Sequence, residues 1–168
     1  MVEAAALVIF PMLMVFSAFS DLFTMTIPNR VSLVLILAYF LLAAYLQTPW
    51  QAVLSHVICA FAILLLTFAL FHFEWIGGGD AKLAASTALW LGWDHLLDYG
   101  LAASIAGGVL TLVIMELRRH SLPAKLLSYR FISLWADKGN GVPYGIALAI
   151  AGLLIYPQTS VWERLSGL

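Results

Sequence analysis

Residues 52–82 read AVLSHVICAFAILLLTFALFHFEWIGGGDAK. The first part, from Ala52 to Phe73, is an almost continuous apolar run without Asp, Glu, Lys or Arg, and a helix needs about 20 apolar residues to cross a membrane. The second part is a run of three glycines that ends in Asp80, at the start of a further apolar segment. A carboxylate at a membrane boundary is costly, so it marks a candidate functional site whose partner must be found. We therefore predict an all-helical membrane protein with Asp80 in its site.

The composition of the whole chain favours the same class. Of its 168 residues, 63% are hydrophobic and 10% are charged, whereas about a quarter are charged in a soluble domain. The linkers between the apolar stretches leave no room for a separate soluble domain, so we predict a single membrane-embedded domain over residues 1–168. The formal net charge of -1 provides no overall basic field for binding nucleic acid.

Six apolar stretches are candidate transmembrane helices of a polytopic bundle. They are Val2 to Ser20, Val31 to Leu46, Ala52 to Phe73, Ala81 to Trp93, Gly100 to Met115 and Val142 to Tyr156. The first has no Lys or Arg before it, which a signal peptide would need, so we expect it to be a span that is not cleaved. The fourth is short for a full crossing.

The basic residues predict the orientation, because Lys and Arg accumulate in short cytoplasmic loops. If all six stretches cross, only Arg164 lies on the outer side, and seven basic residues share the other side: Arg30, Lys82, Arg118, Arg119, Lys125, Arg130 and Lys138. If the fourth stretch did not cross the membrane, these seven basic residues would be divided between its two sides. We therefore expect a multi-pass protein of the inner (cytoplasmic) membrane with both termini outside, and with Asp21 and Asp80 both at the cytoplasmic face.

Asp21 is the partner that this topology gives to Asp80. It ends the first span, because Pro28 disfavours helix at Ile27 and Asn29 suits a turn or the cap of the next helix. Two carboxyl groups a few ångströms apart tend to share one proton. The ionised group can then take a proton from water while the protonated group polarises a scissile carbonyl.

Each acid also has a simpler interpretation when it is taken alone. Asp21 would be an interfacial residue without a special role, and Asp80 would be the N-cap of a helix after a flexible hairpin. The run Gly77, Gly78 and Gly79 weighs against a plain hairpin, because consecutive glycines let another chain approach the backbone closely. The sequence alone leaves open whether the two helices meet.

No metal, cofactor or nucleophile is predicted. The four histidines are scattered and lack the spacing of metal ligands; they are His56, His72, His95 and His120. Cys59 is the only cysteine, which excludes an internal disulfide and a cysteine-cluster zinc site.

Three segments together resemble the type IV prepilin peptidase family, which belongs to the Gly-x-Gly-Asp intramembrane aspartyl proteases. They are Asp21 with Ile27-Pro28-Asn29, then Gly77-Gly78-Gly79-Asp80-Ala81-Lys82, then Pro143-Tyr144-Gly145. The resemblance implies that Asp21 and Asp80 are catalytic. It also implies motif support from Gly77, Gly78, Gly79, Lys82, Pro28 and Asn29.

The same resemblance implies a substrate and a reaction. Members of this family remove the short basic leader of prepilins or pseudopilins at the cytoplasmic face, just before an apolar helix. Larger members also carry a cysteine-rich zinc segment and methylate the new N-terminus, whereas this chain resembles the compact members of tight-adherence (Flp-type) pilus systems. Methyltransferase activity is therefore not expected. Glu74 and Asp137 fall on the cytoplasmic side and are candidates for binding the basic leader.

Two alternative functions come from other classes. A protease of the signal-peptide-peptidase or presenilin type would resemble a longer chain with Tyr before the first acid, whereas Ser20 precedes Asp21 here. A small proton-coupled transporter would also need two membrane carboxylates. The lack of corresponding interrupted segments in the two halves of the chain counts against a transporter.

Overall fold

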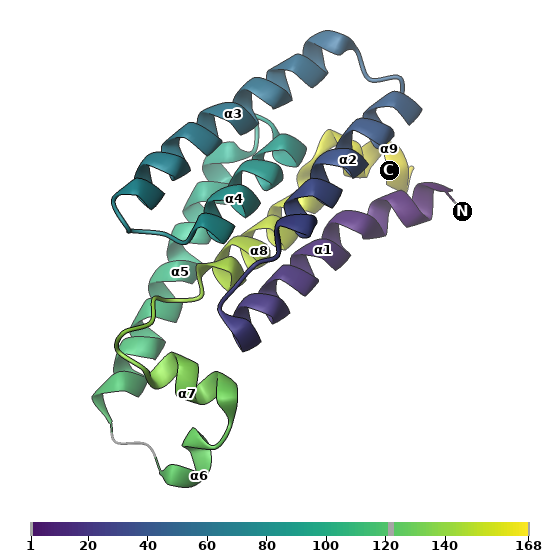
Figure 1. Ribbon diagram of the computed structural model, residues 1–168. Coiled ribbons are helices and arrows are strands. Elements are labelled where there is room, and N and C mark those ends of the chain that lie inside the picture. Colours follow the sequence, from purple (N-terminus) through teal and green to yellow (C-terminus); the bar gives the residue numbers. More distant parts are fainter. Residues whose placement is uncertain (1, 121–122, 168) are drawn as a thin grey trace.

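The computed structural model describes residues 2–120 and 123–167, and within these ranges it contains helices and no β-strand, which confirms the all-helical class. The longer helices are α1 (Val2–Thr24), α2 (Asn29–Tyr45), α3 (Trp50–His72), α4 (Gly78–Leu91), α5 (Leu96–Arg119) and α8 (Tyr144–Ile155). The shorter ones are α6 (Ala124–Leu127), α7 (Arg130–Ala136), the 3-10 turn η1 (Tyr156–Gln158) and α9 (Ser160–Ser166). The start of α1 and α9 lie together at one end of the bundle, and α6 and α7 extend beyond the other end (Figure 1).

Each of the six predicted stretches forms a helix, with bounds that differ by a few residues. By length and apolar composition, α1, α3 and α5 can each cross a membrane, and α8 with η1 and α9 can form a fourth crossing that bends by 58°. The 14 residues of α4 extend over about 21 Å, which is less than the hydrocarbon core of about 30 Å. These helices identify an integral membrane protein, while the count of six crossings stays a prediction.

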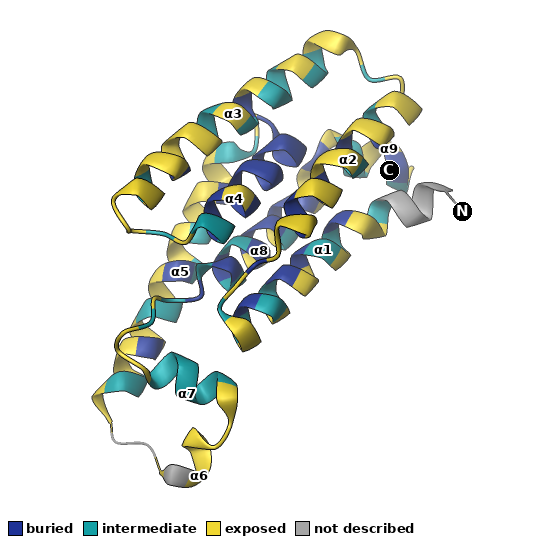
Figure 2. Cartoon of the chain, in the orientation of Figure 1, coloured by how far each residue is buried: buried dark blue, intermediate teal, exposed yellow. Residues whose placement is uncertain are grey.

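The short helix α4 lies at the centre of the bundle. Helices α2, α3 and α8 pack around it, and Figure 2 shows α4 mostly in the colour of buried residues. At its end, Trp90 packs against Phe10 of α1 with ring centroids 5.2 Å apart, and its indole N–H donates to the carbonyl of Leu35 in α2 at 3.0 Å. Because its neighbours cover it, α4 has little surface that lipid would contact.

The outer helices have the opposite character. Large apolar side chains point outward along α3 and α5, and they include Phe61, Leu65, Phe68, Leu112 and Val113. An exposed apolar surface of this extent is typical of a protein that contacts other apolar material, here the lipid of a membrane. The fold therefore buries α4, which carries Asp80 in its first turn, behind helices whose outer faces are apolar.

Arg118 at the end of α5 fixes the connection into α8. Its guanidinium donates to the carbonyl of Trp135 at 2.8 Å and to the carbonyls of Asn140 and Gly141 at 2.9 Å each. The indole N–H of Trp135 donates in turn to the carbonyl of Leu22 in α1 at 3.2 Å. These contacts hold the segment before Pro143 close to the end of α1.

Candidate functional site

Asp21 lies in the last turn of α1 and is only 4% exposed. The backbone N–H groups of Gly145 and Ile146, in the first turn of α8, face its carboxyl group. Its Oδ2 atom has no hydrogen-bond partner among the described residues. Burial disfavours a negative charge on this carboxyl group, and the partial positive charge at the N-terminus of α8 offsets part of that cost.

Asp80 lies in the first turn of α4 and is 8% exposed. Its Oδ2 atom accepts a hydrogen bond from the backbone N–H of Gly77 at 3.2 Å. The backbone N–H of Gly145 faces this carboxyl group as well, and Asp21 is a near enough neighbour to repel its negative charge. The structure thus brings the two predicted acids together at the N-terminus of α8.

Close packing explains each of the three glycines before Asp80. A Cβ atom on Gly77 would lie 2.9 Å from Oδ2 of Asp80, one on Gly78 would lie 3.3 Å from the ring of Phe71, and one on Gly79 would lie 3.2 Å from Cβ of Ile27. Real Cβ atoms essentially never approach to 2.9 Å. The glycines therefore let the start of α4 pack tightly against α3 and the loop after α1, while their role in admitting a substrate stays a prediction.

Gly145 is a residue of the site for which no role was predicted from the sequence. A Cβ atom there would lie 2.6 Å from Cδ1 of Ile27 and 2.8 Å from Oδ2 of Asp21. Ile27 is buried and also contacts Gly79, so one side chain separates the starts of α4 and α8. In the sequence, the available signal for Gly145 is its place after Pro143 at the start of an apolar helix.

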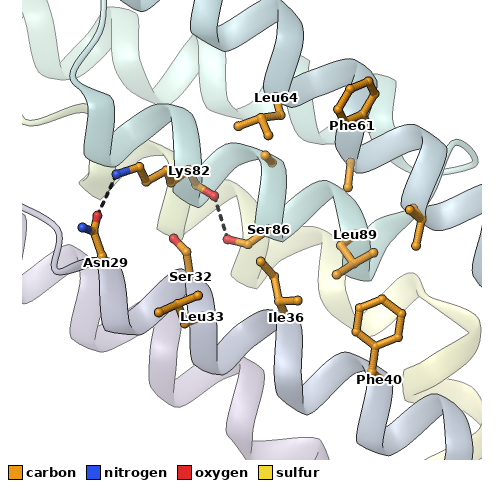
Figure 3. A pocket seen from close by; sticks show the side chains of 13 residues that line it. Asn29, Ser32, Leu33, Ile36, Phe40, Phe61, Leu64, Lys82, Ser86 and Leu89 are labelled. Carbon is orange, nitrogen blue, oxygen red and sulfur yellow. Dashed lines mark hydrogen bonds between the residues drawn. The ribbon is translucent and has the colours of Figure 1, made fainter.

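Lys82 and Asn29 form a bridge between two helices. The Lys82 ammonium donates to Oδ1 of Asn29 at 2.8 Å, which joins α4 to the first residue of α2 (Figure 3). Pro28 precedes Asn29 as the N-cap residue of α2, with a φ angle of -62°. Lys82 is two residues beyond Asp80, about 200° further around α4, so it points away from the paired acids.

If the Lys82 side chain stabilises the protein only through its hydrogen bond to Asn29, removing either side chain should lower the stability by the same amount. We expect Lys82→Ala and Asn29→Ala to lower thermal stability equally and the double variant to be no worse than either, with a coupling free energy of about 1 kcal/mol. The measurement is thermal unfolding of the three variants and the parent in one detergent. Additive losses would show that Lys82 does not act through Asn29.

A cavity beside this bridge is named here the Lys82 cavity. It has a volume of about 540 Å³ and lies between α2, α3 and α4. Its lining is apolar except near Lys82 and Asn29, where Ser32 and Ser86 add hydroxyl groups (Figure 3).

The two acidic candidates for leader binding lie in different loops. Glu74 follows α3, is exposed and has a φ angle of 60°. It lines a pocket of about 500 Å³, named here the Glu74 pocket, together with Gly77 and Tyr144. Asp137 is exposed after α7, and its Oδ1 atom accepts the backbone N–H of Gly139 at 2.9 Å. The structure thus places Glu74, which lines a pocket shared with Gly77, near the glycines of the site.

Comparison with known proteins agrees with the resemblance noted in the sequence. The chain is 28% identical over 141 residues to a prepilin leader peptidase/N-methyltransferase of Aeromonas salmonicida (strain A449), a match that covers 80% of this chain and 42% of that protein. A second Aeromonas salmonicida sequence with the same description matches equally, so the chain spans less than half the length of these relatives. No solved structure matches. The profile of the type IV leader peptidase family matches residues 8–112, a range that includes both Asp21 and Asp80 and more than half of the chain. This chain therefore belongs to the type IV leader peptidase family.

Proposed function

We propose that this protein is a membrane aspartic endopeptidase that removes the short basic leader from type IV (Flp-like) prepilins, with Asp21 and Asp80 as its catalytic pair. One observation carries the proposal. Two buried carboxyl groups, from helices far apart in the sequence, face the same backbone N–H of Gly145 in a chain that belongs to a leader peptidase family. The proposal covers peptide cleavage alone.

The two carboxyl groups of the pair have different roles in hydrolysis. Because two adjacent carboxylates repel each other, the pair holds one shared proton. The ionised carboxylate takes a proton from a water molecule as its oxygen attacks the scissile carbonyl, and the protonated carboxyl group hydrogen-bonds to the carbonyl oxygen. The tetrahedral intermediate collapses when the leaving amine takes a proton, and the pair returns to one proton. The N-terminus of α8 stabilises the negative charge that remains on the pair.

The proposed topology has six crossings in the inner membrane, with both termini outside and the paired acids at the cytoplasmic face. Two features support it. The start of α1 and α9 lie at the end of the bundle opposite α6 and α7 (Figure 1). The segment that holds α6 and α7 is basic, with Arg118, Arg119, Lys125, Arg130 and Lys138, as expected of a cytoplasmic loop.

The test is leader removal by the purified protein in lipid nanodiscs. The substrate is a synthetic peptide with a basic leader followed by an apolar helix, and mass spectrometry identifies both products. We expect a single cut between the leader and the helix, without added metal. Membership of a peptidase family favours this outcome over the proton-coupled transporter. Folded protein that leaves several such peptides intact would contradict the proposal.

A further inference from the structure

A cavity opens directly onto Asp80 and is named here the Asp80 cavity. It has a volume of about 700 Å³ and lies between α3, α4, α5 and α8, within the range of about 300–1,000 Å³ that ligand pockets span. Small residues on α5 give it its width, namely Ala103, Ser104, Gly107 and Gly108. Most of the remaining lining is aliphatic, so the cavity suits an apolar segment that ends at Asp80.

The Glu74 pocket adjoins the Asp80 cavity and has a different character. Ile76 and Tyr144 line both spaces. The Glu74 pocket also contains His72 and the backbone of Gly77. Within the described part of the chain, Glu74 has no ion-pair partner, since the ion pairs there join Glu116 to Arg119 and His120. An unpaired carboxylate in an open pocket attracts a cationic segment.

Tyr144 stands at the boundary between the two spaces. Its ring lies 3.2 Å from the position of a Cβ atom on Gly107, and its hydroxyl group is 3.2 Å from Oγ1 of Thr111. The next residue is Gly145, whose N–H faces both Asp21 and Asp80. A peptide that passed Tyr144 from one space to the other would therefore pass the paired acids.

We propose that the Glu74 pocket and the Asp80 cavity together form one substrate channel. The cationic leader lies in the Glu74 pocket. The scissile bond lies beside Tyr144 and next to Asp80. The apolar segment that follows the scissile bond lies along α5 in the Asp80 cavity. This assignment rests on the proposed function and adds the path and the direction of the substrate. The Lys82 cavity is the wrong choice for a basic leader, because its polar end carries the Lys82 ammonium group.

Two glycines of α5 give a matched test of the apolar half of the channel. Gly108 and Gly100 are both exposed, and a Cβ atom on either would meet nothing within 4 Å. Only Gly108 lines the Asp80 cavity. We expect Gly108→Leu to lower kcat/KM for the prepilin peptide by about tenfold or more, mainly through KM, while Gly100→Leu stays within about twofold of the parent.

A variant of the Lys82 cavity distinguishes the two routes. Ala60→Leu fills that cavity and is expected to leave cleavage unchanged. Normal cleavage by Gly108→Leu, at equal protein level and equal thermal stability, would overturn the channel. Loss of cleavage in Ala60→Leu alone would overturn it in favour of the other cavity. If Gly108→Leu leaves cleavage unchanged and alters only the lipid that co-purifies with the protein, the Asp80 cavity holds an acyl chain. That result would also overturn the proposal.

The polar half is tested by charge. We expect Glu74→Gln to lower cleavage of a peptide with a Lys- and Arg-containing leader by about threefold to tenfold at low salt, and to have no effect on the same peptide with Gln at those leader positions. Glu163→Gln is the matched control outside the channel, because Glu163 is an exposed acid in α9 and lines neither space. An equal loss on both peptides would contradict leader binding at Glu74. If the parent cleaves neither peptide, the proposed function fails, whereas cleavage that none of these variants alters overturns the channel alone.

Discussion

Asp80→Asn and Asp21→Asn are each expected to reduce leader removal by about 10²–10⁴-fold or more. An amide can neither accept a proton from water nor hold the shared proton, so either substitution disables the pair. Asn keeps the size of Asp, and its side-chain oxygen can still accept the Gly77 N–H that Oδ2 of Asp80 accepts now at 3.2 Å. The start of α4 should therefore survive, and the loss should be one of chemistry rather than of folding.

The measurement compares initial rates of leader removal at equal amounts of folded protein in nanodiscs. Asp94→Asn is the control, because Asp94 is an exposed acid after the far end of α4. Cleavage should remain near the parent rate in the control, and the double variant Asp21→Asn/Asp80→Asn should be no slower than the slower single variant, as expected for residues that act as a unit. Undiminished cleavage by either single variant would refute the catalytic pair.

The two acids could be found from the sequence because their signals are local. A carboxylate beside an apolar run is unusual in itself, and the distribution of Lys and Arg then predicts that Asp21 and Asp80 lie at one face. The apolar runs also gave the helices to within a few residues. What the sequence could not give is the contact itself, because the end of α1 and the start of α4 both reach the N-terminus of α8, which depends on packing between distant segments.

The roles of the supporting residues were hidden for the same reason. Position 79 favours glycine because a Cβ atom there would lie 3.2 Å from Cβ of Ile27. Lys82 forms a hydrogen bond with Asn29, a residue 53 positions away in the chain. Neither partner follows from local propensity, which describes each segment without its neighbours. The length of α4 is a further feature that the sequence alone does not explain. Its 14 residues are few for a membrane helix, and the structure shows that α2, α3 and α8 cover it.

Gly145→Ala is expected to lower activity by about 100-fold. The added Cβ atom would lie 2.6 Å from Cδ1 of Ile27 and 2.8 Å from Oδ2 of Asp21. Overpacking of this kind costs about 1–3 kcal/mol of stability, and a displacement of a catalytic group by about 1 Å can cost 10²-fold in rate. Gly100→Ala is the matched control, since a Cβ atom there meets nothing within 4 Å and Gly100 lines neither the Glu74 pocket nor the Asp80 cavity, and it should leave both stability and cleavage unchanged.

A second substitution separates the two clashes. Ile27→Val removes the Cδ1 atom that the new methyl group would strike, but leaves the contact with the Asp21 carboxyl group in place. The double variant Ile27→Val/Gly145→Ala should therefore recover thermal stability relative to Gly145→Ala while its cleavage rate stays low. If cleavage recovers together with stability, Gly145 serves packing alone and its N–H does not position the acids. If stability recovers without cleavage, the close contact between Gly145 and Asp21 is what the reaction requires.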